Sequence, residues 1–220
     1  MAAHIASTPR EVAVFWFGPE WESNRAALST AEYFGPAAMK RWYGGGAEAD
    51  AECAAFADLI HKAGRGELKD APGWGSTPEA RVATVVLLDQ LSRGAFRGTP
   101  EAFAYDQAAQ EATLAAVNAG QDASLSAAER KFLYMPLMHS EEAAHHELGV
   151  RLFTALAEQY PTVGTMAYTL KFAKEHAAVI ERFGRYPHRN ALHGRTTTPE
   201  EAAWLASPDL PSWAKSQQSK

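Results

Sequence analysis

The sequence predicts an all-α protein, a compact array of about eight to nine helices. Three observations carry this prediction: repeated helix-start signals, glycines where helices would end, and no alternating run of β-branched residues that would indicate a strand. A threonine–proline pair followed by an acid recurs along the chain; threonine caps free amides and proline fits the first helical position. The expected helices span residues 9–17, 30–42, 47–64, 78–93, 100–118, 127–135, 140–160, 164–183 and 199–206.

Start and stop signals justify these elements in order. Thr-Pro signals precede the helices that begin at residues 9, 78, 100 and 199, and in the first and last of them a glutamate completes a capping box. Ser126 starts the helix over 127–135, which Pro136 should end or kink because proline lacks an amide; Ser140 should cap the next helix. Glycines follow the helical patterns as expected of C-terminal caps: Gly18, Gly44, Gly94, Gly98, Gly120 and Gly184.

Length and composition indicate one globular domain. With 220 residues, 46% of them apolar and 21% charged, the chain fits a single helical domain over 8–206, with a flexible N-terminus at 1–7 and a loosely ordered tail at 207–220. A net charge of −5 argues against a nucleic-acid partner. The start lacks a signal peptide and no apolar run is long enough to span a membrane, so we expect a cytoplasmic protein without a membrane partner.

Disulfides, metals and cofactors are not expected. Cys53 is the single cysteine, which excludes an intrachain disulfide and a cysteine metal cluster. Glu142 and His145 have the Glu-x-x-His spacing of helical metal sites, but such sites need that motif twice. We therefore expect neither a metal nor a cofactor.

Charged side chains on apolar helix faces are the first candidates for a site. In the helix over 78–93, three valines define one face and leucines the opposite one, and Asp89 and Arg93 fall within the valine face. Because an unpaired buried charge is costly, we expect these two residues to pair with each other or across helices. They either fix the helix register or form the polar floor of a pocket, to which Arg97 would add a further cation.

Two histidines are likewise either structural residues or part of a site. His176 lies on the apolar stripe of the helix over 164–183, where it is either a satisfied core residue or a cavity lining. His139 stands at the joint between two helices, directly before Ser140 and the acidic residues Glu141 and Glu142.

The stretch RFGRYPHRNALHGR, residues 182–195, gathers four arginines and two histidines without a lysine. Residues 171–195 hold six Lys/Arg and two Glu, a local charge of +4 that leaves −9 elsewhere. Guanidinium groups suit directed hydrogen bonding to carboxylates and phosphates. Two interpretations remain open. The arginines either pair with Asp89, Glu141, Glu142 and Glu181 as architecture, or converge with His139 and His176 on a small anion.

Three long motifs resemble a known family: LLDQLSRGAFRGTPEAFAYD (87–106), FLYMPLMHSEE (132–142) and ERFGRYPHRNALHGRTTTPEE (181–201). With VFWFG (14–18) and RWYGG (41–45) they are similar to the domain-of-unknown-function 924 family, over about residues 8–206. The resemblance implies an all-helical α-α superhelix akin to tetratricopeptide-repeat arrays and brings no established reaction. The family motifs fall on Asp89, Gln90, Arg93, Arg97, His139, Ser140, Glu141, His176, Arg182, Phe183, Gly184, Arg185, Pro187, His188, Arg189, Asn190, Gly194 and Arg195. The chain departs from the family at His146, where a glutamine is expected, and in LHGR.

Three functions are consistent with these residues. The first is a binding protein whose polar pocket holds a small anion, such as a phosphate or carboxylate, or an acidic peptide end. The second is an enzyme that uses His139 or His188 as general acid or base with arginines stabilising negative charge. The third is a structural protein-interaction module in which these motifs are architectural. The ligand-binding candidates are Asp89, Arg93, Arg97, Ser140, Glu141, His176, Arg182, Arg185, Arg189, Asn190 and Arg195; the oligomeric state stays open.

Overall fold

The computed structural model describes residues 8–75 and 77–216, and every regular element in these ranges is a helix, which confirms the all-α prediction. The flexible N-terminus predicted at 1–7 lies outside the described residues. The α-helices are α1 (Pro9–Phe17), α2 (Glu20–Ser23), α3 (Pro36–Tyr43), α4 (Ala47–Ala54), α5 (Ala57–Gly64), α6 (Pro78–Val85), α7 (Ser92–Ala95), α8 (Asp106–Asn118), α9 (Ala127–His139), α10 (Ala143–Gln159), α11 (Gly164–Phe183), α12 (Pro199–Leu205) and α13 (Ser212–Ser216). Short 3₁₀ turns occupy Arg25–Ser29, Pro100–Phe103, Gln121–Ser124 and Pro187–Arg189, and a π-helical turn spans Val86–Leu91.

The predicted helix starts at residues 9, 78, 127 and 199 are confirmed, and each is capped by the hydroxyl of the residue before it. Thr8, Ser126 and Thr198 form full capping boxes, and Thr77 accepts a hydrogen bond from the Ala80 amide. Thr99 departs from this pattern: it precedes only a 3₁₀ turn, without a side-chain cap bond.

Two predicted boundaries around Pro136 are wrong, the end of one helix at residue 135 and the start of the next at residue 140. Helix α9 continues through Pro136 to His139, because proline removes one amide donor while the following turn still forms its own bonds. Ser140 is the C-cap of α9 rather than the N-cap of α10, although its hydroxyl does accept a hydrogen bond from the Glu142 amide at 3.0 Å.

Other helix boundaries also differ from those predicted from the sequence. The helix expected over 47–64 is divided into α4 and α5, and the one expected over 30–42 begins only at Pro36. Conversely, the helix expected over 78–93 is continuous but incorporates the π-helical turn. Local propensity is only a weak guide to such boundaries.

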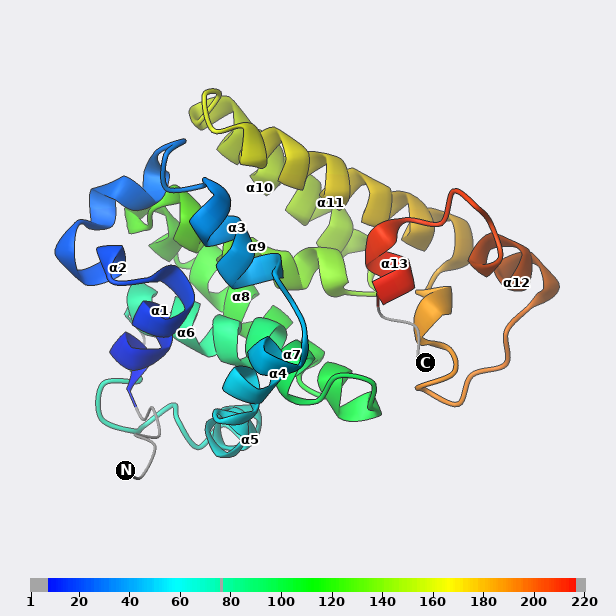
Figure 1. Cartoon of the computed structure of the whole chain (residues 1–220), viewed down its shortest axis with the longest axis horizontal. Coiled ribbons are helices and arrows are strands. Elements are labelled where there is room, and N and C mark those ends of the chain that lie inside the picture. The colour runs from blue at the N-terminus through cyan, green and yellow to red at the C-terminus, as the bar shows by residue number, and fades with distance from the viewer. Residues whose placement is uncertain (1–7, 76, 217–220) are drawn as a thin grey trace.

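The core forms around α9. Figure 1 shows α10 and α11 as a long hairpin, with the N-terminal helices on one side of α9. Fully buried side chains of α1, the π turn and α9 meet in this core, among them Phe17, Leu88 and Phe132. The hairpin is compatible with the helix-pair packing of tetratricopeptide-repeat arrays, and the superhelix itself stays a prediction.

A second, smaller apolar cluster holds the C-terminal segment. Val179, Ile180 and Tyr186 form it, with Trp204 and Trp213 packed against them. The described part of the predicted tail, residues 207–216, carries α13 and buries Leu210 and Ala214. Figure 1 shows α12 and α13 beside the C-terminal end of α11. The chain after Gly184 is therefore attached to the helices by aromatic packing as well as by its charges.

Among the helices that the structure describes, none has the length and apolarity needed to cross a membrane.

Candidate functional site

Asp89 lies in the π-helical turn between α6 and α7 and is fully buried. Hydrogen bonds in such a turn run from residue i to i+5, so the side chains leave the regular α-helical register. Single π turns inside α-helices occur frequently at functional sites. The turn therefore marks the place where a charged residue enters the core.

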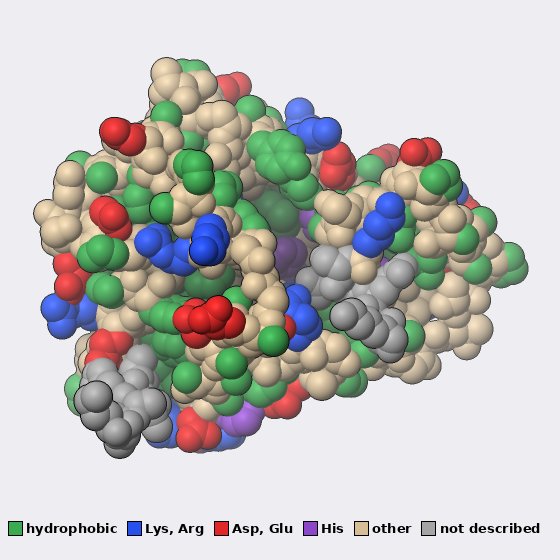
Figure 2. Space-filling model, in the orientation of Figure 1, with side chains coloured by type: hydrophobic (Ala, Val, Ile, Leu, Met, Phe, Trp, Pro, Cys, Tyr) green, Lys and Arg blue, Asp and Glu red, His purple; other side chains and the backbone are tan. Residues whose placement is uncertain are grey.

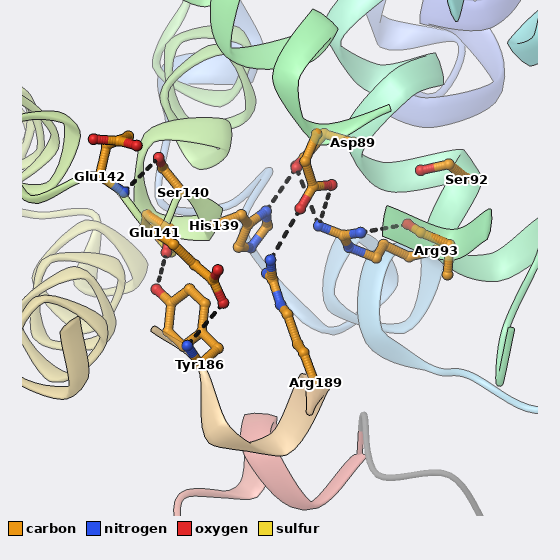
Figure 3. A network of polar contacts seen from close by, with 12 residues as sticks. Asp89, Ser92, Arg93, His139, Ser140, Glu141, Glu142, Tyr186 and Arg189 are labelled. Carbon is orange, nitrogen blue, oxygen red and sulfur yellow. Dashed lines mark hydrogen bonds and ion pairs between the residues drawn. The ribbon is translucent and has the colours of Figure 1, made fainter. Parts of the chain in front are cut away.

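The Asp89 carboxylate faces His139 at the end of α9 (Figure 3). His139 Nδ1 lies 2.7 Å from Asp89 Oδ1, and Gln90 Nε2 donates to Oδ2 at 2.6 Å. Burial alone would raise the pKa of Asp89, but the charge that His139 carries when protonated, its hydrogen bond and the charge of Arg93 hold that pKa below its usual range. Asp89 is therefore ionised at neutral pH.

The second ring nitrogen of His139, Nε2, is unpaired in the described part of the chain. Because an ionised carboxylate only accepts hydrogen bonds, Nδ1 carries the proton and Nε2 of the neutral ring has the lone pair. In the described part of the chain Nε2 has no hydrogen-bond partner, and 16% of the side chain is exposed. Figure 2 shows a hollow in front of the C-terminal end of α9, between α3 and α13, with histidine colour at its base. Asp89 thus orients a partly exposed imidazole whose second nitrogen has no partner among the described residues.

The other two candidate histidines are enclosed. His176 Nδ1 donates to the Phe172 carbonyl at 2.8 Å, and its ring stacks on Trp213 with centroids 3.8 Å apart. Burial holds the pKa of His176 well below its usual range and lowers that of His188 to about 3. Both rings are therefore neutral near pH 7 and buried, whereas the His139 side chain is partly exposed.

Arg93 and Arg189 converge on one carboxylate, Asp106 at the start of α8. Arg93 Nη2 lies 2.7 Å from Asp106 Oδ1 and Arg189 Nη1 lies 3.1 Å from Oδ2. The first contact is an ion pair without an aligned hydrogen bond, and Arg93 also donates to the Ala102 carbonyl. Both guanidinium groups lie over the Phe103 ring. Arg93 and Asp89 do pair at i,i+4, but only at 3.8 Å. Asp106 is thus the principal partner of both arginines.

The remaining candidate arginines are also paired with acids. The four ion pairs are Arg97–Asp50 at 2.8 Å, Arg182–Glu200 at 2.9 Å, Arg185–Glu201 at 2.7 Å and Arg195–Glu141 at 2.8 Å. The hydrogen bonds from Arg185 hold the pKa of Glu201 at about 2, and Asn190 Nδ2 donates to the same carboxylate at 3.2 Å. Arg185 and Arg195 attach the loop after α11 to α12 and to the connection between α9 and α10, and each of the four guanidinium groups has an acid partner.

The His-Ser-Glu stretch connects α9 to the same loop. Glu141 Oε1 accepts from the Tyr186 amide at 2.9 Å, and the Tyr186 hydroxyl donates to the Met138 carbonyl (Figure 3). Ser140 Oγ lies 2.9 Å from His145 Nδ1, and His146 Nε2 donates to the Ser140 carbonyl at 2.7 Å. Ser140 and Glu141 therefore position the segment that carries His139.

The acids that pair with the candidate arginines are only partly those expected from the sequence. Asp89 and Glu141 contact arginines as expected, whereas Glu142 and Glu181 form no ion pair with an arginine in the ranges described. Sequence reasoning missed Asp106, Glu201 and Trp213. The signal for Asp106 was present, since it ends the first family motif, but nothing local identifies which arginine it meets.

Two open concavities lie away from the predicted site residues. One of about 510 Å³ follows the outer face of α11 and one of about 450 Å³ lies between α1 and α6; neither is lined by a predicted site residue. Over the described ranges, no group of three or more His, Cys, Asp or Glu side chains is arranged to hold a metal ion.

Comparisons with known proteins agree with the fold and the motifs. The family model described as bacterial protein of unknown function (DUF924) matches residues 12–209. A solved structure of the protein of unknown function ATU0120 from Agrobacterium tumefaciens is 31% identical over 90% of this chain and 96% of that chain, with a TM-score of 0.63. A comparison with curated proteins found no match.

Proposed function

The chain belongs to the DUF924 family of bacterial proteins of unknown function, and we propose that it is an enzyme whose His139 acts as a general base on a small polar substrate. Asp89 orients the imidazole, and Nε2 takes a proton from a substrate hydroxyl or from water. The single observation that carries this proposal is the buried, ionised Asp89 held 2.7 Å from His139, whose side chain is 16% exposed and whose other nitrogen has no hydrogen-bond partner among the described residues.

Charge balance supports a base rather than a permanent anion site. Asp89 and Asp106 together offset the two cations Arg93 and Arg189, so the cluster is neutral while His139 is neutral. When Nε2 takes a proton, Asp89 stabilises the imidazolium, and the cluster gains one positive charge beside the negative charge created on the substrate. Such assistance typically contributes about 10²–10⁴-fold to a rate.

The test is the hydrolysis of p-nitrophenyl acetate, an activated ester that reports a general base without knowledge of the natural substrate. We expect turnover above the buffer rate that His139→Gln abolishes and Asp89→Asn lowers at least about tenfold. His61→Gln is the matched control, because His61 lies 2.9 Å from Glu101 in an exposed pair. Equal rates in the wild type and His139→Gln would refute the proposal.

A second candidate is the binding of a small anion such as phosphate or a carboxylate. It is favoured by Arg189, whose buried Nε has no hydrogen-bond partner among the described residues. In this case inorganic phosphate or acetate raises the melting temperature through linkage, the Arg189→Met variant loses the shift, and no ester turnover accompanies it. If neither turnover nor a shift is observed, the cluster is architectural.

A further inference from the structure

Lys131 of α9 is a buried amine that the proposed function does not use. Only 1% of the residue is exposed, and in the described ranges its amine has no carboxylate partner. Its one hydrogen-bond partner there is the Tyr43 hydroxyl. The rings of Trp42, Tyr43 and Phe132 surround it, with centroids 4.9, 4.9 and 4.2 Å from Nζ.

This surrounding favours the neutral amine. An ammonium group has three donors, and here it finds one oxygen and aromatic faces. Burial lowers the pKa of Lys131 to about 7, although the rings partly offset the loss of hydration. Burial around its hydroxyl also raises the pKa of Tyr43, although 53% of the residue as a whole is exposed, so the phenol keeps its proton and its oxygen accepts a hydrogen bond from the Lys131 amine. The lone pair of Nζ is therefore populated at physiological pH.

Tyr43, which covers this amine, is a partly exposed residue at the end of a helix. It is the last residue of α3, 53% of it is exposed, and Gly44, Gly45 and Gly46 follow it. Gly45 and Gly46 have φ values of 61° and 95°, in the region that favours glycine. The ring thus covers Lys131 from a helix end that continues into a glycine-rich connection, within the RWYGG motif. Rotation of this ring away from Nζ would open one side of the aromatic surrounding of the amine.

We propose that Lys131 is a reactive amine covered by Tyr43, which condenses with small uncharged aldehydes to form an imine. Nζ forms a bond to the carbonyl carbon, and the carbonyl oxygen leaves as water with the two amine protons. The aromatic walls select the substrate class. They offer no cation to a phosphate or carboxylate, so an apolar aldehyde fits and a phosphorylated one does not.

The experiment uses butyraldehyde with sodium cyanoborohydride, which reduces the imine to a stable secondary amine. Peptide mapping by mass spectrometry then gives the rate at each lysine between pH 6 and pH 10. At pH 7 we expect Lys131 to react at least about tenfold faster than the exposed Lys171, because an ordinary lysine is almost fully protonated there. The Lys131 rate should level off above about pH 8 while that of Lys171 keeps rising.

Variants separate reactivity from access. Lys131→Met removes the adduct and Lys171→Met leaves it in place. Tyr43→Ala exposes the amine and raises the rate, and Tyr43→Phe keeps the cover while removing the hydrogen bond, so it serves if Tyr43→Ala does not fold. The proposal is overturned if Lys131 stays unmodified in the folded wild type and in the folded Tyr43 variants while Lys171 reacts. A Lys131 rate that rises in parallel with Lys171 up to pH 10 also overturns it.

Discussion

The pairing of Asp89 with His139 leads to a quantitative prediction about stability. The carboxylate is fully buried and the bond to Nδ1 is 2.7 Å long, which is typical of a charge-assisted hydrogen bond. Such bonds contribute roughly 1.5–3 kcal/mol, and removing one partner of a buried pair costs about 3–5 kcal/mol. We therefore expect Asp89→Ala to lower the free energy of unfolding by about 3–5 kcal/mol. Asp89→Asn, which keeps the volume and one acceptor, should cost about 1–3 kcal/mol.

A double-mutant cycle isolates the pair. Urea unfolding of the wild type, Asp89→Asn, His139→Gln and the double variant at pH 7 should give a coupling energy of about 1–3 kcal/mol. The same cycle on the exposed His61–Glu101 pair should give less than about 1 kcal/mol. A coupling at Asp89–His139 no larger than that of the surface pair would refute the reasoning.

The pH dependence follows from the lowered pKa of Asp89. Because its pKa in the folded protein lies below the unfolded value of 3.8, Asp89 contributes stability that is fully present above that value. The contribution is lost as the pH falls through the folded pKa. The stability difference between the wild type and Asp89→Asn should therefore persist from pH 7 to about pH 5 and shrink only in more acidic solution.

Three further predictions concern the scaffold. Glu129→Ala removes a fully buried carboxylate that accepts hydrogen bonds from several donors, so it should lower the free energy of unfolding in urea by about 3–5 kcal/mol. The exposed Glu67→Ala should lower it by less than about 1 kcal/mol, and similar losses for the two variants would contradict the role of burial. Gly94→Ala places a methyl group 2.6 Å from Cys53 Sγ, so we expect a loss of about 1–3 kcal/mol, and an unchanged melting temperature would contradict the packing. Lys131→Met should raise the free energy of unfolding by about a few kcal/mol at pH 6 and by progressively less toward pH 10, because the buried lysine binds its proton more weakly in the folded than in the unfolded state. A gain that does not change with pH would contradict the burial of a titrating amine.

The helix starts were predictable from sequence because their signals are local. Ser126 and Glu129 lie three residues apart and satisfy each other's backbone amides, so no distant contact is needed to recognise the start of α9. The end of α9 was not predictable in the same way. Its continuation through Pro136 depends on packing that offsets one missing hydrogen bond.

The candidate site was predictable as a set of residues but not as a geometry. The motifs pointed to Asp89, Arg93, His139 and Arg189, and the structure brings these four together. The motifs did not indicate that Asp106 would pair with both arginines, nor that His176 would lie against Trp213. Those contacts join residues far apart in the chain, and an aspartate carries no local sign of the arginine that it will meet.

The sequence by itself determined an all-α protein, its capped helix starts and the motifs in which polar chemistry concentrates, because propensity, capping and periodicity act over a few residues. Only the tertiary structure decided which acid each guanidinium contacts, and that the His139 side chain stays partly exposed while His188 is buried. Only there do Lys131 and Tyr43, 88 residues apart, meet at one hydrogen bond. The physical reason is that burial and ion pairing depend on distances between packed helices, and no short stretch of sequence contains those distances.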